Sequence, residues 1–208
     1  MKNLNEKELV NLLVEANLIE DVESVTNTFI ATDFDSVMLV DSLEGDFRIY
    51  STYDDAEQDA IETCKEIIED CGLTDNLMNI AYNHGFIDED WFKDYWTELY
   101  QDMAYNEDVQ YIASDEQLEM LENGEMEEDD IREWHYDSLL HSIDGQWIEE
   151  YRYQFGEQDL YSTLLHNNLI DIEELAKYCV DVDGVASYLA SYDHEEIEHN
   201  GYYIYRTN

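Results

Sequence analysis

Apolar residues recur at helical spacing from the start of the chain. Asn5 and Glu8 form a capping box, and the apolar residues behind them make one face of a helix that we expect from about Asn5 to Ala16. The residues of this face are Leu9, Leu12, Leu13 and Ala16. A longer helical pattern, which we expect to be capped by Asp54 with Glu57 completing its box, continues to Gly72.

Two early segments and one late segment have the pattern of strands instead. Ser36–Asp41 and Phe47–Thr52 are separated by a turn at Leu43–Asp46, in which Gly45 supplies the unusual backbone conformation. Tyr202–Arg206 closes the chain as a third strand. These signals predict an α+β fold, mostly helical, whose small antiparallel sheet of about three strands joins the N-terminal hairpin to the C-terminal strand. We expect a single domain over residues 1–208.

The middle of the chain predicts a series of helices. Asp88–Tyr105 has an aromatic face, made of Trp91, Phe92, Tyr95, Trp96, Leu99 and Met103. Ser114 caps a short helix over Asp115–Leu121. The next helix starts in GEMEEDDIREWHYD (residues 124–137), and the candidates for its buried stripe are Ile131, Trp134 and either Tyr136 or Leu139. Further helices are expected at residues 147–153, 158–167, 172–178 and 185–191.

The charge of the chain is extreme. It has 53 acidic and 9 basic residues, a formal charge of -44, and no proline. Disorder is the usual consequence of such charge, but 44% hydrophobic and 13% aromatic residues at helical spacing indicate a folded protein. No apolar run is long enough for a membrane span and no leader opens the chain, so we expect a cytoplasmic protein. Cys64, Cys71 and Cys179 fit reduced core residues.

Carboxylates are densest at residues 88–137, where 19 acids accompany 2 bases. Asp90, Asp94, Glu98 and Asp102 are four residues apart, so they form a stripe opposite the aromatic face. Like charges at this spacing destabilise a helix by a few tenths of a kcal/mol per pair, and Lys93 alone cannot offset them. The stability of the fold does not explain why this repulsion is left uncompensated. We expect partner-binding surfaces at Asp88–Asp102 and Glu125–Asp137, and the candidate residues on them are Asp88, Asp90, Asp94, Glu98, Asp102, Glu125, Glu127, Glu128, Asp129, Asp130, Glu133 and Asp137.

The amount of charge is comparable to that of nucleic acid. Duplex DNA has one charge per ~1.7 Å, so 44 charges equal those of about 22 base pairs. Such a field would steer the protein to the basic clefts of nucleic-acid enzymes. Trp134 and Tyr136 are possible anchors in such an interface, or core residues.

The acidity, the length, the absence of proline, and the Asp- and Glu-rich helices with Tyr and Trp resemble the DNA-mimic inhibitors that phages and mobile elements use against restriction and CRISPR enzymes. DFRIYSTYDDAEQDAIE and SYDHEEIEHNGYYIYRTN are similar to small acidic phage proteins. The resemblance implies an antirestriction or anti-CRISPR protein without catalysis or cofactor. Such a protein would act in the cytoplasm of a phage-infected or mobile-element-bearing bacterial host, on a nuclease or another basic nucleic-acid-binding protein.

Catalysis and direct nucleic-acid binding are disfavoured. The two histidines of HEEIEH, His194 and His199, are five residues apart and diverge by about 140° on a helix, unlike those of a zinc protease. The segment from Asp181 to Gly184 starts like a calcium loop, but its glycine falls too early. Paired carboxylates suited to glycoside hydrolysis are inevitable among so many acids. Nine cations under this field would repel phosphates.

The acidity has two alternative causes. One is the role of an acidic chaperone or sequestering partner of a basic nucleic-acid-binding protein. The second is adaptation to high salt, although 14 asparagines against 10 alanines favour an AT-rich genome instead. The sequence leaves open whether the active form is a homodimer.

Overall fold

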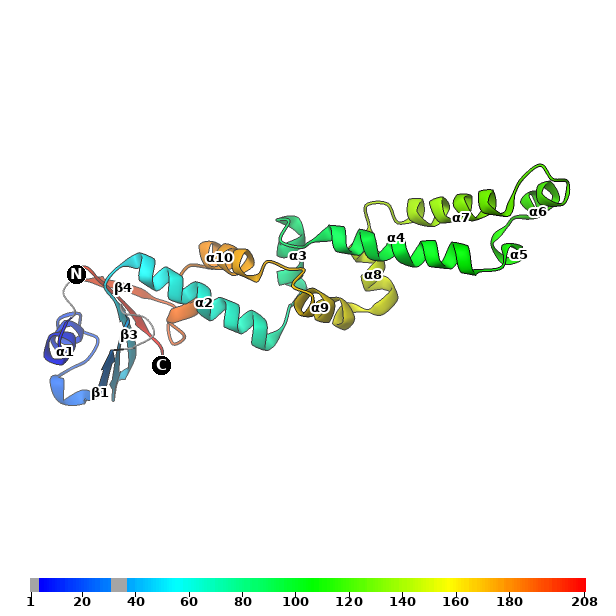
Figure 1. Cartoon of the computed structure of the whole chain (residues 1–208). Helices are drawn as coiled ribbons and strands as arrows, with labels where there is room; N and C mark the ends of the chain where they lie inside the picture. The colour runs from blue at the N-terminus through cyan, green and yellow to red at the C-terminus, as the bar shows by residue number, and fades with distance from the viewer. Residues whose placement is uncertain (1–3, 31–36) are drawn as a thin grey trace. The chain divides into compact units, whose positions relative to one another are not determined.

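A computed structural model describes residues 4–30 and 37–208, and it divides into two compact units (Figure 1). Unit 1 comprises residues 1–80 and 172–208, and unit 2 comprises residues 81–171. The expected single domain stays a prediction, because units of this kind can also fold together. No helix among the described residues is both long enough and apolar enough to cross a membrane.

Unit 1 is built on a five-stranded antiparallel sheet. Its strands are β1 (Val25–Ile30), β2 (Val37–Ser42), β3 (Gly45–Tyr50), β4 (Glu196–His199) and β5 (Tyr202–Arg206), in the order β1-β2-β3-β5-β4. The α+β class, mostly helical, and the sheet that joins the two ends of the sequence are confirmed.

The predicted number of strands was too small. β1 and β4 were missed because β1 is half polar and β4 is mostly polar, so neither has the apolar signal of a buried strand. Ser36, predicted to begin the first strand, lies outside the described residues.

Helix α1 (Glu6–Glu15) covers the sheet with the apolar face that the sequence predicts. Leu9 and Leu13 are buried against sheet residues that include Val40 and Phe47. The capping box of Asn5 and Glu8 is confirmed. The short helix η1 (Val22–Ser24) leads from α1 into β1.

Helix α2 (Tyr53–Cys71) packs with α10 (Ile172–Asp183) and α11 (Ala186–Leu189). The predicted cap was wrong, because Thr52 caps α2 by accepting a hydrogen bond from the backbone N–H of Asp55 at 3.2 Å. Asp54 is in the first turn instead, where its negative charge interacts favourably with the positive end of the helix dipole. Gly72 ends the helix as predicted, with φ of 77°.

Two of the three cysteines belong to the core of unit 1. Cys64 and Cys179 are buried, whereas Cys71 is exposed at the last residue of α2, so the core expectation was wrong for Cys71. All three are free thiols.

Unit 2 is helical. Its helices are α4 (Glu89–Asn106), α5 (Val109–Ile112), α6 (Asp115–Glu122), α7 (Glu128–Ser142), α8 (Trp147–Phe155) and α9 (Glu157–His166), and α3 (Asp75–Asn83) crosses the sequence boundary of the units. The sequence patterns did not indicate α3 or α5. α4 and α7 lie side by side and run antiparallel (Figure 1). An antiparallel bridge pairs Ile87 with Ile170 and so joins the two ends of the unit.

Candidate partner-binding surface

Helix α4 separates an aromatic core face from an acidic surface face. Every fourth residue from Phe92 is buried, in the series Phe92, Trp96, Tyr100 and Ala104. Trp96 and Tyr100 pack against Ile143, and the indole N–H of Trp96 donates to the carbonyl oxygen of Trp147 at 2.9 Å. These contacts fix the rotation of α4 about its axis.

The acids of α4 lie half a turn away from this core. We define the α4 stripe as Asp90, Asp94, Glu98 and Asp102, all of which are exposed. Asp88 is the N-cap of the helix and accepts a hydrogen bond from the N–H of Asp90 at 3.2 Å. Asp88 therefore has a structural role of its own. Within the stripe, Asp90 is in the first turn of α4 and Asp102 accepts a hydrogen bond from the side-chain amide of Asn106.

Helix α7 presents a second acidic row. We define the α7 face as Asp129, Asp130, Glu133 and Asp137, all exposed. Asp130 also accepts a hydrogen bond from the N–H of Glu127 at 3.0 Å in a capping box. The remaining predicted acids, Glu125, Glu127 and Glu128, are exposed at or before the start of α7.

Trp134 lies within the α7 face. It is 56% exposed, and on the helix it follows Asp130 by four residues and precedes Asp137 by three, so both acids are its neighbours. Its predicted place in the buried stripe was wrong, because the buried side of α7 carries Ile131 and the residues that pack on the core cluster of Trp96, Leu139 and Leu140 among them. Tyr136 instead is half-buried in the core cluster of Trp96.

The acids of unit 2 greatly outnumber its cations. Unit 2 has 25 acidic and 3 basic residues, and the structure describes all of them. Its ion pairs are Arg132–Glu128, at 3.9 Å, and Arg152–Glu157. Lys93 makes no ion pair in this unit, and none of the α4 stripe or α7 face carboxylates does. Successive charges in a stripe are about 6 Å apart along the axis, so their repulsion is left in place.

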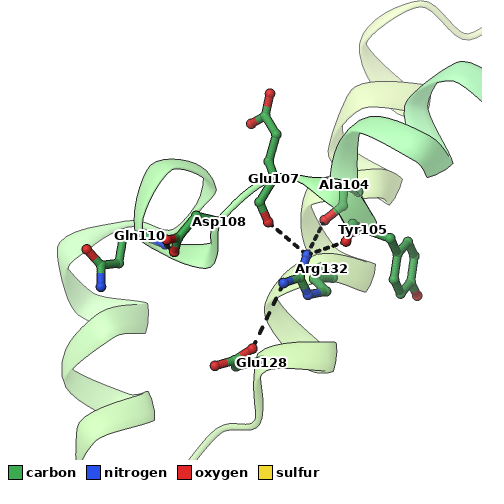
Figure 2. A network of polar contacts seen from close by, with 7 residues as sticks. All are labelled: Ala104, Tyr105, Glu107, Asp108, Gln110, Glu128 and Arg132. Atoms are coloured by element: carbon green, nitrogen blue, oxygen red, sulfur yellow. Dashed lines mark hydrogen bonds and ion pairs between the residues drawn. The ribbon is translucent and has the colours of Figure 1, made fainter.

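Arg132 acts within the fold and does not neutralise these rows. Its side chain is 15% exposed, and its Nη1 donates to the carbonyl oxygens of Ala104, Tyr105 and Glu107 at 2.8, 3.0 and 3.0 Å (Figure 2). These carbonyls are at the C-terminal end of α4, which has unsatisfied acceptors and a partial negative charge. Sequence reasoning missed this role, for which a lone arginine in an acidic run was the available signal.

The most enzyme-like arrangement lies in unit 1. Asp59 pairs with Arg48 at 3.0 Å and accepts a hydrogen bond from the phenol of Tyr50. Burial, followed by the bond to Asp59, raises the pKa of Tyr50 well above its usual range. Tyr50 is fully buried, so a substrate cannot reach this phenol and the network holds β3 to α2.

The two histidines of HEEIEH are not on a helix. His199 ends β4, and His194 precedes this strand with φ of 58°. Among the residues that the structure describes, no three His, Cys, Asp or Glu side chains gather as a metal site.

No protein-family model, curated protein or solved structure matches this chain.

Proposed function

We propose that the protein is a non-catalytic inhibitor that imitates nucleic acid and occupies the DNA- or RNA-binding cleft of a restriction or CRISPR nuclease. The observation that carries this proposal is that the α4 stripe and the α7 face lie exposed on two packed helices and meet no cation of unit 2. A cleft lined with lysine and arginine would supply the missing charges.

The spacing of the charges within each row can be compared with that of phosphates. Each row offers about one carboxylate per 6 Å of helix axis. A single DNA strand has one phosphate per ~3.4 Å. Each row alone is therefore about half as dense in charge as one DNA strand, so the proposal requires further carboxylates of unit 2 to take part, and Glu125, Glu127 and Glu128 are exposed beside the α7 face.

Trp134 adds a different kind of contact to this surface. Tryptophan and tyrosine are enriched among residues that dominate protein interfaces, and arginine binds over the face of an indole ring. An exposed indole between Asp130 and Asp137 therefore fits an arginine of a basic cleft.

The proposal is tested with purified protein and a restriction or CRISPR nuclease. We expect the protein to reduce DNA binding and cleavage, with inhibition that weakens steeply as salt rises, because exposed charges are screened. If the nuclease cleaves its DNA to completion at the uninhibited rate, at low salt and with excess protein, that nuclease is excluded as the target.

The alternative is an acidic chaperone that sequesters a basic nucleic-acid-binding protein. One observation favours it: unit 1 has 28 acids and 6 bases and so matches the net charge of -22 in unit 2. Acidity is thus not confined to α4 and α7. This alternative predicts a tight complex with a small basic protein and no effect on nucleases, and capture from a bacterial lysate followed by elution with DNA separates the two. Either function places the protein in the bacterial cytoplasm.

A further inference from the structure

A hollow of about 490 Å³ lies among α5, α6 and the start of α7 in unit 2. We call it the tip hollow. Its apolar wall comprises Val109, Leu118 and Leu121, and its carboxylates are Asp108, Glu122 and Glu128. Its volume falls within the ~300–1000 Å³ range of ligand sites.

The wall of the tip hollow is held in place by the fold. Val109 is buried with Ile112 and Ile131 in a cluster that Leu118 and Leu121 complete. Asp108 caps α5 by accepting a hydrogen bond from the N–H of Gln110 at 3.0 Å. Arg132 ties the adjoining end of α4 to α7, as Figure 2 shows beside Asp108 and Glu128.

The three carboxylates have little compensation. Glu128 lies 3.9 Å from Nη2 of Arg132, whose Nη1 already serves three carbonyl oxygens. Neither Asp108 nor Glu122 makes an ion pair within unit 2, which is described throughout. A ligand that fits must therefore combine apolar surface with positive charge.

We propose that the tip hollow binds one long basic side chain of a protein partner. The methylene groups of a lysine or arginine would lie against Val109, Leu118 and Leu121, while the charged end reaches the carboxylates. An apolar side chain would strip water from three charges without replacing it, and a metal ion would not use the apolar wall. The inference rests on the proposed function in taking a basic protein as partner, and it adds one anchoring contact to it.

The test is an NMR titration of the ¹⁵N-labelled full chain with n-butylguanidinium, guanidinium and a blocked glycine–arginine–glycine peptide. We expect n-butylguanidinium and the peptide to cause saturable shifts at the amides of Val109, Leu118 and Leu121, with guanidinium binding at least about three-fold more weakly because it lacks the apolar stem. Asp108→Asn keeps a capping residue and Glu122→Gln keeps the shape, and each should weaken binding about two- to five-fold.

Glu119→Gln is the matched control, because Glu119 is exposed on the same helix α6 but does not line the tip hollow. Equal affinities of n-butylguanidinium and guanidinium, or an equal loss of affinity in Glu119→Gln, would overturn the proposal and indicate that the whole acidic surface attracts cations. Spermidine is a basic ligand that is not a protein. Amide shifts with spermidine but none with the peptide would show that the hollow does not take a side chain of a protein partner. This assay needs no nuclease, so wild-type binding without inhibition rejects the proposed function alone, and inhibition without hollow binding rejects the tip hollow alone.

Discussion

Nη1 of Arg132 on α7 lies 2.8 Å from the carbonyl oxygen of Ala104 on α4 and donates a hydrogen bond to it. The same nitrogen also serves Tyr105 and Glu107. One of the three cations of unit 2 thus satisfies the C-terminal carbonyls of its longest helix. The basic residue that sequence inspection would assign to charge balance is instead a helix cap.

Replacement of Arg132 should therefore destabilise unit 2. We expect Arg132→Met to cost about 2 kcal/mol of the free energy of unfolding, since hydrogen bonds from charged groups contribute roughly 1.5–3 kcal/mol. Urea unfolding followed by circular dichroism measures the change. Arg152→Met is the control, because the Arg152–Glu157 pair is half exposed and its loss should cost under about 1 kcal/mol. Equal costs would show that the carbonyl contacts add nothing.

The three thiols should differ in reactivity. Cys71 is exposed, whereas Cys64 and Cys179 are buried. Burial raises the pKa of Cys179 to about 11 and raises that of Cys64 as well, so both remain protonated at pH 8. We expect Ellman's reagent to modify one thiol rapidly in the native protein and three after unfolding. Cys71→Ser should remove the fast phase, and a fast phase that persists would contradict this assignment.

Stability should fall in alkaline solution. Burial is the main cause that raises the pKa of Tyr50 and of Tyr205, which also donate to Asp59 and Glu196. The unfolded chain loses these protons near pH 10 while the folded chain keeps them, so their stabilisation is complete below pH 10 and is lost as pH rises above it. Cys179 adds a loss between pH 9 and about 11.

Each buried phenol should lower the free energy of unfolding by up to about 1.4 kcal/mol per pH unit above pH 10. Urea unfolding of the wild type and of Tyr50→Phe between pH 8 and 11 measures the effect. The stability of the variant should decline less steeply with pH. Parallel curves would mean that Tyr50 ionises as easily in the folded protein as in the unfolded one.

The sequence predicted best where one interaction dominates. The period of apolar residues set the rotation of α4, so the exposed side of Asp94 followed from the buried side of Trp96. Asn5 and Glu8 act within one helical turn, which makes their capping box legible without any tertiary information.

Tertiary contacts account for the failures. β4 is a strand because Ile197 and its neighbours pair with β5, although two of its four residues are glutamates. Trp134 looks like a core residue by type, but the α7 residues that pack into the core cluster of Trp96 are Tyr136, Leu139 and Leu140, and Trp134 is exposed. Asp108, Glu122 and Glu128 line the same tip hollow although they come from a turn and two helices, an arrangement that no local pattern encodes.

The α4 stripe offers the sharpest test, because function and stability should move in opposite directions. Asp94→Lys turns the like-charge pairs with Asp90 and Glu98 into opposite-charge pairs, which should stabilise α4 by about 0.5–1 kcal/mol. The same change should weaken nuclease inhibition, and adding Asp90→Lys and Glu98→Lys should remove it. Thermal unfolding and a cleavage assay on the same preparations measure both effects.

Glu66→Lys on α2 is the matched control for this change. Glu66 is exposed and lies four residues from both Glu62 and Asp70, so the substitution changes the net charge by the same amount and places a lysine between two acids of unit 1, of which Glu62 already pairs with Lys65. If Glu66→Lys inhibits the nuclease fully and Asp94→Lys inhibits it less, the carboxylates of α4 are responsible for the inhibition, because the total charge of the two variants is identical. Equal loss in both would mean that net charge alone acts, and full potency in both would reject the stripe. On this hypothesis, the repulsion between the stripe carboxylates persists because an external partner binds them, although a single lysine could relieve it. The hypothesis therefore requires that Asp94→Lys be more stable than the wild type and inactive as an inhibitor.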